Sequence, residues 1–434
     1  MIPKGTDVVQ TVRELQRELY RSAKSNPKRS FYTLRDKIYR WDVLVYAWKQ
    51  VCANHGAPGI DGITIEQIKE QGEEQFLRQV QQELKEGTYR CKKTRRVEIP
   101  KPKGGGIRIL GVPTIKDRLV QTATRLVIEP IFETDFQGCS FGFRPKRSAV
   151  HASLEIYKWL NYGLTQVLDI DLKRYFDSIP HDKLMKVIQR RISDRYVLKL
   201  IKSWLRSGVL KGEEAIIRGQ GAPQGSPISP LFSNIYLNLL DTVWIERMTE
   251  RRGWNAQIVR YADDLVILSN KPVGKVLDIL RGYLKRLDLP INEEKSRTVT
   301  VEEGFNFLGY AFKRGYSPRY QKPVTHIYPT PDAIKRIIKK ITQLTYRSRL
   351  HESVETIVKD LNASLLGWTE YYRHTASSRR FRKVQGHATR RLRRFIMKKK
   401  GSRKNGYKEL PDEKLHKVYK LVNVGVSRVQ YRWT

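Results

Sequence analysis

The sequence predicts an α+β protein with a small, mostly antiparallel sheet, followed by an all-helical C-terminal region. Strand-type runs at TQVLDIDL (165–172) and IVRYADDLVILS (258–269) alternate with helical segments in the middle of the chain. This interleaving is typical of an α+β domain. Beyond about Ser317 the strand-type runs largely stop, and helical periodicity continues over 329–346, 354–374 and 381–399. We therefore predict a domain boundary near Ser317.

The N-terminal part is predicted to be mainly helical. From about Thr11 to Asn54, apolar residues recur at three- and four-residue steps, as expected for one face of a helix; they include Leu34, Ile38, Trp41, Leu44, Trp48 and Val51. The glycine-rich segment NHGAPGIDG (54–62) separates this part from a second helical pattern over 65–84. Residues 95–111, RRVEIPKPKGGGIRILG, predict a hairpin with basic arms around a Gly-Gly-Gly turn, and helical pattern resumes over 115–132.

The central part contains two further short strand-type runs, EEAIIRG (213–219) and NFLGYAF (306–312). Helical patterns separate the strands at 181–191, 197–205, 230–251 and 273–287. Strands and helices alternate here, so this region is expected to carry the sheet.

The composition points to a polyanionic partner. The 434 residues include 83 Lys and Arg against 44 Asp and Glu, a net charge of +39, and 40% are apolar. That apolar content excludes disorder of the whole chain, and nucleic acid is the commonest polyanion that relieves such a charge. A ribosome-associated or general RNA-coating protein fits the charge equally well. Without a signal-like start or an apolar run of about 18 residues, we expect a cytoplasmic protein, most simply in a bacterial cytosol, with no membrane partner.

Basic residues concentrate near the C-terminus. No acidic residue stands between Glu370 and Glu409, whereas RRFRK (379–383), RRLRR (390–394) and KKK (398–400) follow in turn. Solvated helices usually mix both signs of charge, so this stretch is interpreted as a phosphate-contacting surface rather than a merely soluble tail. The candidate RNA-binding residues are Arg379, Arg380, Arg382, Lys383, Arg390, Arg391, Arg393 and Arg394.

The strongest candidate for chemistry is Tyr261-Ala262-Asp263-Asp264, flanked on both sides by apolar strand residues. Two adjacent carboxylates in such a context are costly unless something neutralises them. A divalent cation does so economically, and hard oxygen ligands suit Mg²⁺. The alternative is an Asp-Asp turn that caps the amides of its own hairpin.

A second acidic strand supports the metal hypothesis. In VLDIDLKRYFDSI (167–179), a period of two places Val167, Asp169 and Asp171 on one face. An aspartate at the end of this strand could meet the Asp263 turn. Carboxylates from two strands could then hold two metal ions ~3.5–4 Å apart, the arrangement for in-line nucleotidyl transfer.

Two other segments are candidates for triphosphate binding, each weak by itself. Lys101 and Arg108 flank the GGG turn and could contact a phosphate chain, although an exposed, soluble turn explains them equally well. APQGSP (222–227) offers a glycine that permits close backbone approach and Gln224, which could pack beside a sugar or base.

Together these segments resemble reverse transcriptases, with blocks in that family's order from about Asn54 to Phe312. The blocks are IPKPKGGGIR, SFGFRP, DIDLKRYFD, PQGSPISP, RYADD, INEEKS and NFLGY. Within the family the chain is most similar to group II intron-encoded reverse transcriptases, the maturases. NHGAPGIDG is similar to their extra N-terminal block, and LNASLLGWTEYYRH (361–374) looks like their thumb or maturase domain.

The resemblance implies a right-hand polymerase fold. The expected parts are an N-terminal helical extension (1–53), fingers with the extra block (54–165), a palm with an antiparallel sheet and part of the fingers interleaved (166–316), a helical thumb or X domain (317–400), and a short basic C-terminal segment (401–434). No endonuclease domain is expected, because the last segment lacks paired cysteines and a His-rich pattern.

The resemblance also implies roles for individual residues. Asp171 and Asp263 would be the principal metal ligands, with Asp264 beside them and the Leu172 carbonyl assisting, around two Mg²⁺ ions for which Mn²⁺ could substitute. Asp169 stays a rival to Asp171, although the spacing to the aromatic residue favours the latter. The nucleotide-contacting roles would be a steric gate that selects dNTPs at Phe176, triphosphate binding at Lys101 and Arg108, a nucleotide neighbour at Gln224, and a proton donor to pyrophosphate at Lys295.

The function expected from this resemblance is RNA-directed DNA polymerisation, extending a DNA primer on an RNA template. Binding of a group II intron RNA to assist splicing and mobility is expected with it. Two alternatives stay open: a host-adopted reverse transcriptase in repair or defence, and an RNA-binding splicing factor in which polymerisation is secondary.

Overall fold

The computed structural model describes residues 5–100, 107–207, 209–211, 214–216, 220–222, 225–251, 255–317, 321–402 and 404–425. Lys101, the Gly-Gly-Gly turn and Gln224 lie outside these ranges, so the roles predicted for them stay predictions. The chain forms two compact units. The first comprises residues 1–148, 168–267 and 271–297, and the second comprises 149–167, 268–270 and 298–434. The predicted domain limits at 53, 165, 316 and 400 stay predictions.

The N-terminal part of the first unit is helical, as predicted, but it is divided differently. The expected helical region from about Thr11 to Asn54 is three helices, because the chain leaves the helix at Asn26-Pro27, where proline cannot continue it. A capping box between Thr64 and Gln67 starts the next helix. The helices of this part are α1 (Gly5–Ser25), α2 (Arg35–Ile38), α3 (Trp41–Ala53), α4 (Ile65–Glu86) and α5 (Ile115–Glu133).

The predicted basic hairpin is confirmed. Strands β1 (Thr94–Pro100) and β2 (Ile107–Val112) pair antiparallel, from Arg95 opposite Val112 to Pro100 opposite Ile107. They belong to a four-stranded sheet of order β2-β1-β4-β5, in which β4 (Val209–Lys211) runs parallel to β1 and antiparallel to β5 (Glu214–Ile216).

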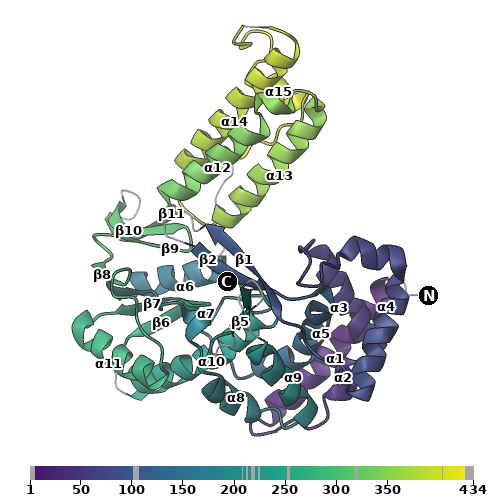
Figure 1. The fold of residues 1–434 in the computed structure, drawn as a ribbon. Helices are drawn as coiled ribbons and strands as arrows, with labels where there is room; N and C mark the ends of the chain where they lie inside the picture. Colours follow the sequence, from purple (N-terminus) through teal and green to yellow (C-terminus); the bar gives the residue numbers. More distant parts are fainter. Residues whose placement is uncertain are drawn as a thin grey trace. The chain divides into compact units, whose positions relative to one another are not determined.

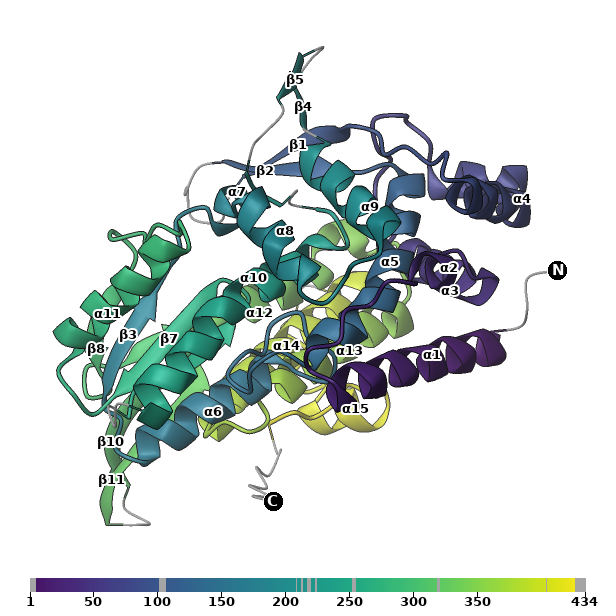
Figure 2. The same cartoon turned by 90° about the horizontal axis from the view of Figure 1, so that it is seen from below.

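The acidic strands lie in a second four-stranded sheet, of order β6-β7-β3-β8. Strands β6 (Gln257–Tyr261) and β7 (Asp264–Ser269) are joined by Ala262 and Asp263 alone, and β3 (Gln166–Ile170) lies beside β7 (Figure 2). The fourth strand is β8 (Arg297–Thr300). The acidic turn and the end of the acidic strand therefore come from neighbouring strands.

Helices of the first unit pack around these strands through an apolar core. They are α7 (Tyr175–Ser178), α8 (His181–Gln189), α9 (Arg195–Arg206), α10 (Ser229–Trp244) and α11 (Val273–Arg286). The helix predicted over 230–251 changes type: α10 ends at Trp244 and a π-helix, η2, continues over Ile245–Arg251.

The second unit contains one strand that the sequence analysis missed, β11 (Lys322–Pro329). It pairs with β10 (Tyr310–Ser317), which pairs on its other side with β9 (Phe305–Phe307). Strand character therefore continues past Ser317 to Pro329. The strand β11, KPVTHIYP, is rich in β-branched and aromatic residues, the composition that favours strands.

Helices complete the second unit, and α12, α13 and α14 run side by side (Figure 1). Their apolar stripes form a separate core that includes Ile341, Leu361 and Leu392. The helices are α6 (Ala149–Asn161), α12 (Pro331–Leu344), α13 (Val354–Tyr372), α14 (Ser378–Lys399) and α15 (Asp412–Lys417), with one 3₁₀ turn, η3, at Arg347–Arg349. The predicted class, α+β with a helical C-terminal region, is confirmed, but the strands of the described ranges form three sheets instead of one. No helix in the described ranges is long and apolar enough to cross a membrane.

Candidate active site

Most of the residues predicted to bind metal, act in catalysis or contact the nucleotide line one cleft in the first unit, with a volume of about 1760 Å³. The predicted residues on its wall are Arg108, Asp171, Leu172, Phe176, Asp263 and Lys295. Residues that are more than 180 positions apart in the chain, such as Arg108 and Lys295, thus face a common space. The fold brings together what sequence reasoning placed in separate motifs.

The Asp263 carboxylate stands at a strained turn. Ala262 has φ of 58°, in the left-handed region, where a non-glycine residue costs roughly 1–2 kcal/mol. Ala262 is buried, whereas Asp263 faces the cleft and is partly exposed. Burial raises the pKa of Asp263, and so does Asp171, while Arg108 and Arg260 act in the opposite direction. The turn therefore presents a carboxylate that would gain from a nearby cation.

The Asp171 carboxylate is held by residues that the sequence analysis did not single out. Asn292 donates its side-chain Nδ2 to Asp171 Oδ1 at 3.1 Å, and its backbone N–H donates to the Asp171 carbonyl at 2.8 Å. The Asp171 backbone N–H donates to Ser296 Oγ at 3.1 Å. Both belong to the INEEKS block, from which only Lys295 was predicted to act. The available signal was their position in that block, on either side of Lys295.

The remaining two aspartates interact with this pair electrostatically. The protein groups around Asp264 partly desolvate its carboxyl and raise its pKa to about 7, and the charges of Asp263, Asp169 and Asp171 add to this shift. One side of the Asp264 residue is still exposed to solvent. Burial likewise raises the pKa of Asp169 to about 6; Arg297 opposes this shift and Asp171 adds to it. Neither Asp169 nor Asp264 is among the residues that line the cleft. Asp171 therefore lies on the cleft wall and Asp169 does not, and the choice of Asp171 as the metal ligand stays a prediction.

The carboxylates fit a divalent cation without forming a closed cage. Within the described ranges, no three side chains of His, Cys, Asp or Glu are grouped so that they could hold a metal ion by themselves. Of the three carboxylates expected to converge, Asp171 and Asp263 lie on the cleft wall, whereas Asp264 does not. Mg²⁺ commonly takes one or two carboxylates and fills its shell with water and substrate phosphates. An oxygen donor pair with a raised pKa at Asp263 suits that ion.

Two of the predicted nucleotide-contacting residues, Phe176 and Arg108, lie on the same cleft wall as this pair. Phe176 is partly buried and packs edge-on against Tyr175, with ring centroids 5.5 Å apart. Arg108 is exposed on the cleft wall, close enough to act on the pKa of Asp263. Gly225 has φ of 108°, and a Cβ there would lie 2.9 Å from the Gly111 carbonyl oxygen. Glycine at this position permits the backbone at Gly225 to approach β2 closely.

The basic residues of α14 divide into two groups. Arg379, Arg382, Lys383, Arg390 and Arg394 are exposed, as a phosphate-contacting surface requires. Two others are engaged inside the second unit. Arg380 stacks over the Tyr328 ring at 3.9 Å, and Arg391 donates to Thr345 Oγ1 at 2.9 Å.

Arg393 requires a correction. It was predicted to bind RNA, but it is only 1% exposed. Its Nε donates to the Leu410 carbonyl at 2.7 Å, its Nη2 pairs with Asp412, and its guanidinium stacks on Tyr407. The Arg393 side chain is buried where α14 packs against the segment that follows it. Its guanidinium therefore does not contact RNA.

Comparison with known protein families agrees with this geometry. Residues 99–312 match the family of reverse transcriptases (RNA-dependent DNA polymerases), and residues 334–410 match the maturase-specific domain of group II introns. The chain belongs to the group II intron reverse transcriptases. It is accordingly an RNA-directed DNA polymerase by family, and this family depends on divalent metal and binds RNA.

Individual relatives of this group II intron reverse transcriptase differ in length. It is 33% identical over 377 residues to protein YkfC of Escherichia coli, which covers 78% of this chain and 98% of YkfC. It is 32% identical over 292 residues to the group II intron-encoded protein LtrA of Lactococcus lactis, over 64% of this chain and 48% of LtrA. A putative COX1/OXI3 intron 2 protein of Saccharomyces cerevisiae is 26% identical over 76% of this chain and 47% of that protein. The chain thus spans nearly all of YkfC but about half of the two intron proteins.

Proposed function

We propose that this chain extends a DNA primer on an RNA template by two-metal nucleotidyl transfer at Asp171 and Asp263. The observation that carries the proposal is the common cleft wall on which these two carboxylates and Arg108 lie. When bound there, two Mg²⁺ ions would polarise the primer 3′-OH and offset charge on the leaving pyrophosphate. Mn²⁺ would be an acceptable substitute, because it too prefers oxygen ligands.

The protein residues would divide the remaining tasks. Arg108 would bind the triphosphate of the incoming dNTP, and Lys101 and Gln224 are proposed to contact the same nucleotide. Phe176 would exclude a ribose 2′-OH by steric contact and so select dNTPs. Lys295, on the wall of the same cleft, would donate a proton to the pyrophosphate. Asp264 and the Leu172 carbonyl would complete the oxygen donors around Asp171 and Asp263.

We further propose that the second unit binds the intron RNA and so assists splicing. Two observations favour this role: the match of residues 334–410 to a maturase-specific domain, and the exposed basic residues of α14. If splicing assistance is a separate function, a polymerase-dead variant will still support self-splicing of the host intron at low Mg²⁺. Loss of splicing assistance in that variant would contradict the separation.

Primer extension on an RNA template tests the polymerase proposal. Asp263→Asn removes one charged ligand and is expected to reduce the rate at least about 100-fold, because losing several kcal/mol of charge stabilisation costs that much. Asp135→Asn is the matched control, since Asp135 is also a partly buried aspartate whose pKa is raised by burial but does not line the cleft. Equal rates for Asp263→Asn and the parent protein would refute the catalytic assignment.

A further inference from the structure

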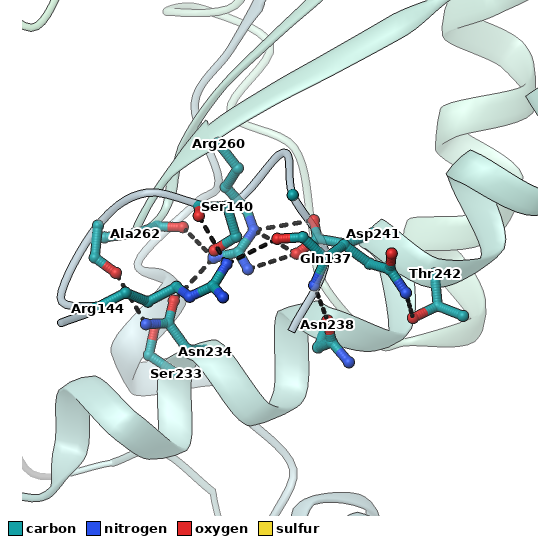
Figure 3. Close-up of polar contacts among 12 residues, drawn as sticks. Gln137, Ser140, Arg144, Ser233, Asn234, Asn238, Asp241, Thr242, Arg260 and Ala262 are labelled. Carbon is teal, nitrogen blue, oxygen red and sulfur yellow. Dashed lines mark hydrogen bonds and ion pairs between the residues drawn. The ribbon is translucent and has the colours of Figure 1, made fainter. Parts of the chain in front are cut away.

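A buried ion pair lies directly behind the catalytic turn. Arg260, the second residue before Ala262, and Asp241 on α10 are both 0% exposed. Arg260 Nε donates to Asp241 Oδ1 at 2.9 Å, and Nη2 donates to Asp241 Oδ2 at 2.5 Å (Figure 3). Replacing a buried ion pair with apolar residues is often neutral for stability. Burial of this pair therefore calls for a reason other than stability.

The third nitrogen of the Arg260 guanidinium, Nη1, contacts the catalytic turn itself. Arg260 Nη1 donates to the Ala262 carbonyl oxygen at 2.9 Å and to Asn234 Oδ1 at 3.0 Å (Figure 3). The Ala262 carbonyl belongs to the peptide that joins Ala262 to Asp263. A hydrogen bond that orients this peptide therefore orients the backbone from which the Asp263 carboxylate extends. The planar fork of an arginine can hold a carboxylate and a carbonyl at the same time in fixed geometry.

The segment from Cys139 to Gly142 also packs against the turn at Ala262. The Arg260 backbone N–H donates to the Cys139 carbonyl at 2.9 Å, and the Phe141 N–H donates to the Arg260 carbonyl at 2.8 Å. Gly142 follows, and a Cβ there would overlap the Ala262 backbone nitrogen and come within 2.9 Å of the Tyr261 carbonyl carbon. The turn is thus packed against a glycine backbone.

Asn234 connects Arg260 with the Gly142 segment through its side-chain amide. Its Oδ1 accepts from Arg260, and its Nδ2 donates to the Gly142 carbonyl at 2.8 Å. Helix α10 therefore contributes two buried side chains, Asp241 and Asn234, that hold Arg260 and the Gly142 segment together. Every contact lies within the first unit. This arrangement over-determines the left-handed conformation at Ala262, which is the condition under which backbone strain persists at functional sites.

We propose that Arg260 is a positioning residue for metal binding. With Asp241 and Asn234, it holds the Ala262–Asp263 peptide so that the Asp263 carboxylate is preorganised to take a divalent cation. Arg260 does not touch substrate; it acts through the turn. This inference rests on the proposed role of Asp263 and goes beyond it by assigning the support of that ligand.

Binding of Mn²⁺ to the full-length protein, followed by electron paramagnetic resonance without substrate, tests the inference. Arg260→Lys keeps a positive charge beside Asp241 but loses the fork that reaches Ala262. It is expected to weaken Mn²⁺ binding roughly 10- to 100-fold, the usual cost of removing a group that orients a metal ligand. The Mg²⁺ concentration for half-maximal primer extension is expected to rise in parallel.

Arg191→Lys is the matched control. Arg191 is also buried, pairs with Asp135, and donates to several backbone carbonyls, but its partners lie near α1 and α5. The Arg191→Lys variant is expected to have a lower melting temperature than the parent protein and the same Mn²⁺ affinity. If Arg260→Lys does not fold, the double variant Arg260→Met with Asp241→Leu replaces the pair by apolar side chains of similar volume. The folded double variant is expected to show the same loss of Mn²⁺ affinity.

The outcomes separate this inference from the proposed function. Unchanged Mn²⁺ affinity in a folded Arg260 variant, with affinity lost in Asp263→Asn, overturns the positioning role and leaves the catalytic assignment standing. Unchanged Mn²⁺ affinity and primer extension in Asp263→Asn overturns both. Weaker binding in the Arg260 variants but not in Arg191→Lys supports the inference.

Discussion

Asp263 and Asp264 are adjacent in the chain but occupy different environments. Asp263 lines the cleft, whereas Asp264 begins β7, and surrounding groups together with three neighbouring aspartates raise its pKa to about 7. A carboxyl with a pKa raised by folding binds its proton more tightly in the folded protein than in the unfolded chain. Between the ordinary value of 3.8 and about 7, the folded protein therefore holds more protons, and its stability falls as pH rises.

Removing the Asp264 charge should therefore stabilise the metal-free protein above this window. We expect Asp264→Asn to raise the melting temperature at pH 8 by roughly 2–4 °C, a modest shift because the exposed side chain is screened by solvent. The gain should disappear at pH 4, where the carboxyl is protonated in the folded parent protein. The gain in melting temperature should also shrink when Mg²⁺ is added, since a bound cation reduces the repulsion between Asp264 and the neighbouring aspartates.

Differential scanning calorimetry in EDTA measures this effect. Asp278→Asn is the control, because it removes the same charge from an exposed position on α11. A melting temperature for Asp264→Asn at pH 8 that is equal to or below that of the parent would contradict the prediction.

At the scale of the element, α14 illustrates how one helix serves packing and charge together. Its apolar stripe, including Phe381, Leu392 and Phe395, is buried in the core of the second unit. Arginines on the opposite face are exposed, while Arg393 turns inward to Asp412. A run such as RRLRR is therefore not uniform, because helical periodicity distributes successive residues to different faces.

We expect the two kinds of arginine in α14 to have different roles. Changing exposed Arg379, Arg382, Arg390 and Arg394 to alanine should weaken binding of the intron RNA and flatten its salt dependence. The slope of log affinity against log salt should fall by about 0.7–0.9 for each phosphate that the variant no longer neutralises. The melting temperature should change little.

Arg393→Ala is the matched comparison. It should leave the salt slope unchanged but lower stability by about 1–3 kcal/mol, because the Leu410 carbonyl loses a buried donor. Filter binding across a salt series and thermal melting measure the two effects. An unchanged salt slope in the fourfold variant would exclude a direct phosphate role for this face.

At the scale of the whole molecule, the N-terminal extension is part of the first unit's core. The residues of α1 that recur at three- and four-residue steps, Val8, Val12, Leu15 and Leu19, are all buried. Arg191 further holds the end of α1 and the residue that follows it, because it donates to the carbonyls of Ala23 and Asn26. These contacts give the extension a structural role in the unit that carries the cleft.

The extension should therefore affect global stability. We expect Leu19→Ala to lower the free energy of unfolding by about 2–5 kcal/mol, the usual cost of truncating a buried leucine. Arg17→Ala, at an exposed position of the same helix, should change it little. Urea unfolding monitored by tryptophan fluorescence compares them. Equal midpoints for Leu19→Ala and the parent protein would show that α1 does not contribute to the cooperative core.

Local patterns in the chain were sufficient for the fold class and for the principal acidic residues. Asp171 and Asp263 stand in short motifs where strand periodicity and neighbouring apolar residues mark them, and the helices of 65–84 and 354–374 follow from apolar spacing. The division of the N-terminal helical region was missed because apolar spacing continues on both sides of the break at Asn26-Pro27. Strand β11 was missed although its composition favours a strand, because the region beyond Ser317 was predicted to be helical.

Tertiary structure alone decided which charges are buried and what they hold. Arg260 and Asp241 are separated by 18 residues, and nothing in the sequence indicates that they pair with each other, yet they are fully buried behind Ala262. Arg393 stands between exposed Arg390 and Arg394 in one run, yet it is buried because α14 packs against the segment that contains Leu410 and Asp412. Periodicity assigns a residue to a face of its own element, but only the packing of elements against one another determines whether that face meets solvent, a partner charge or a backbone carbonyl.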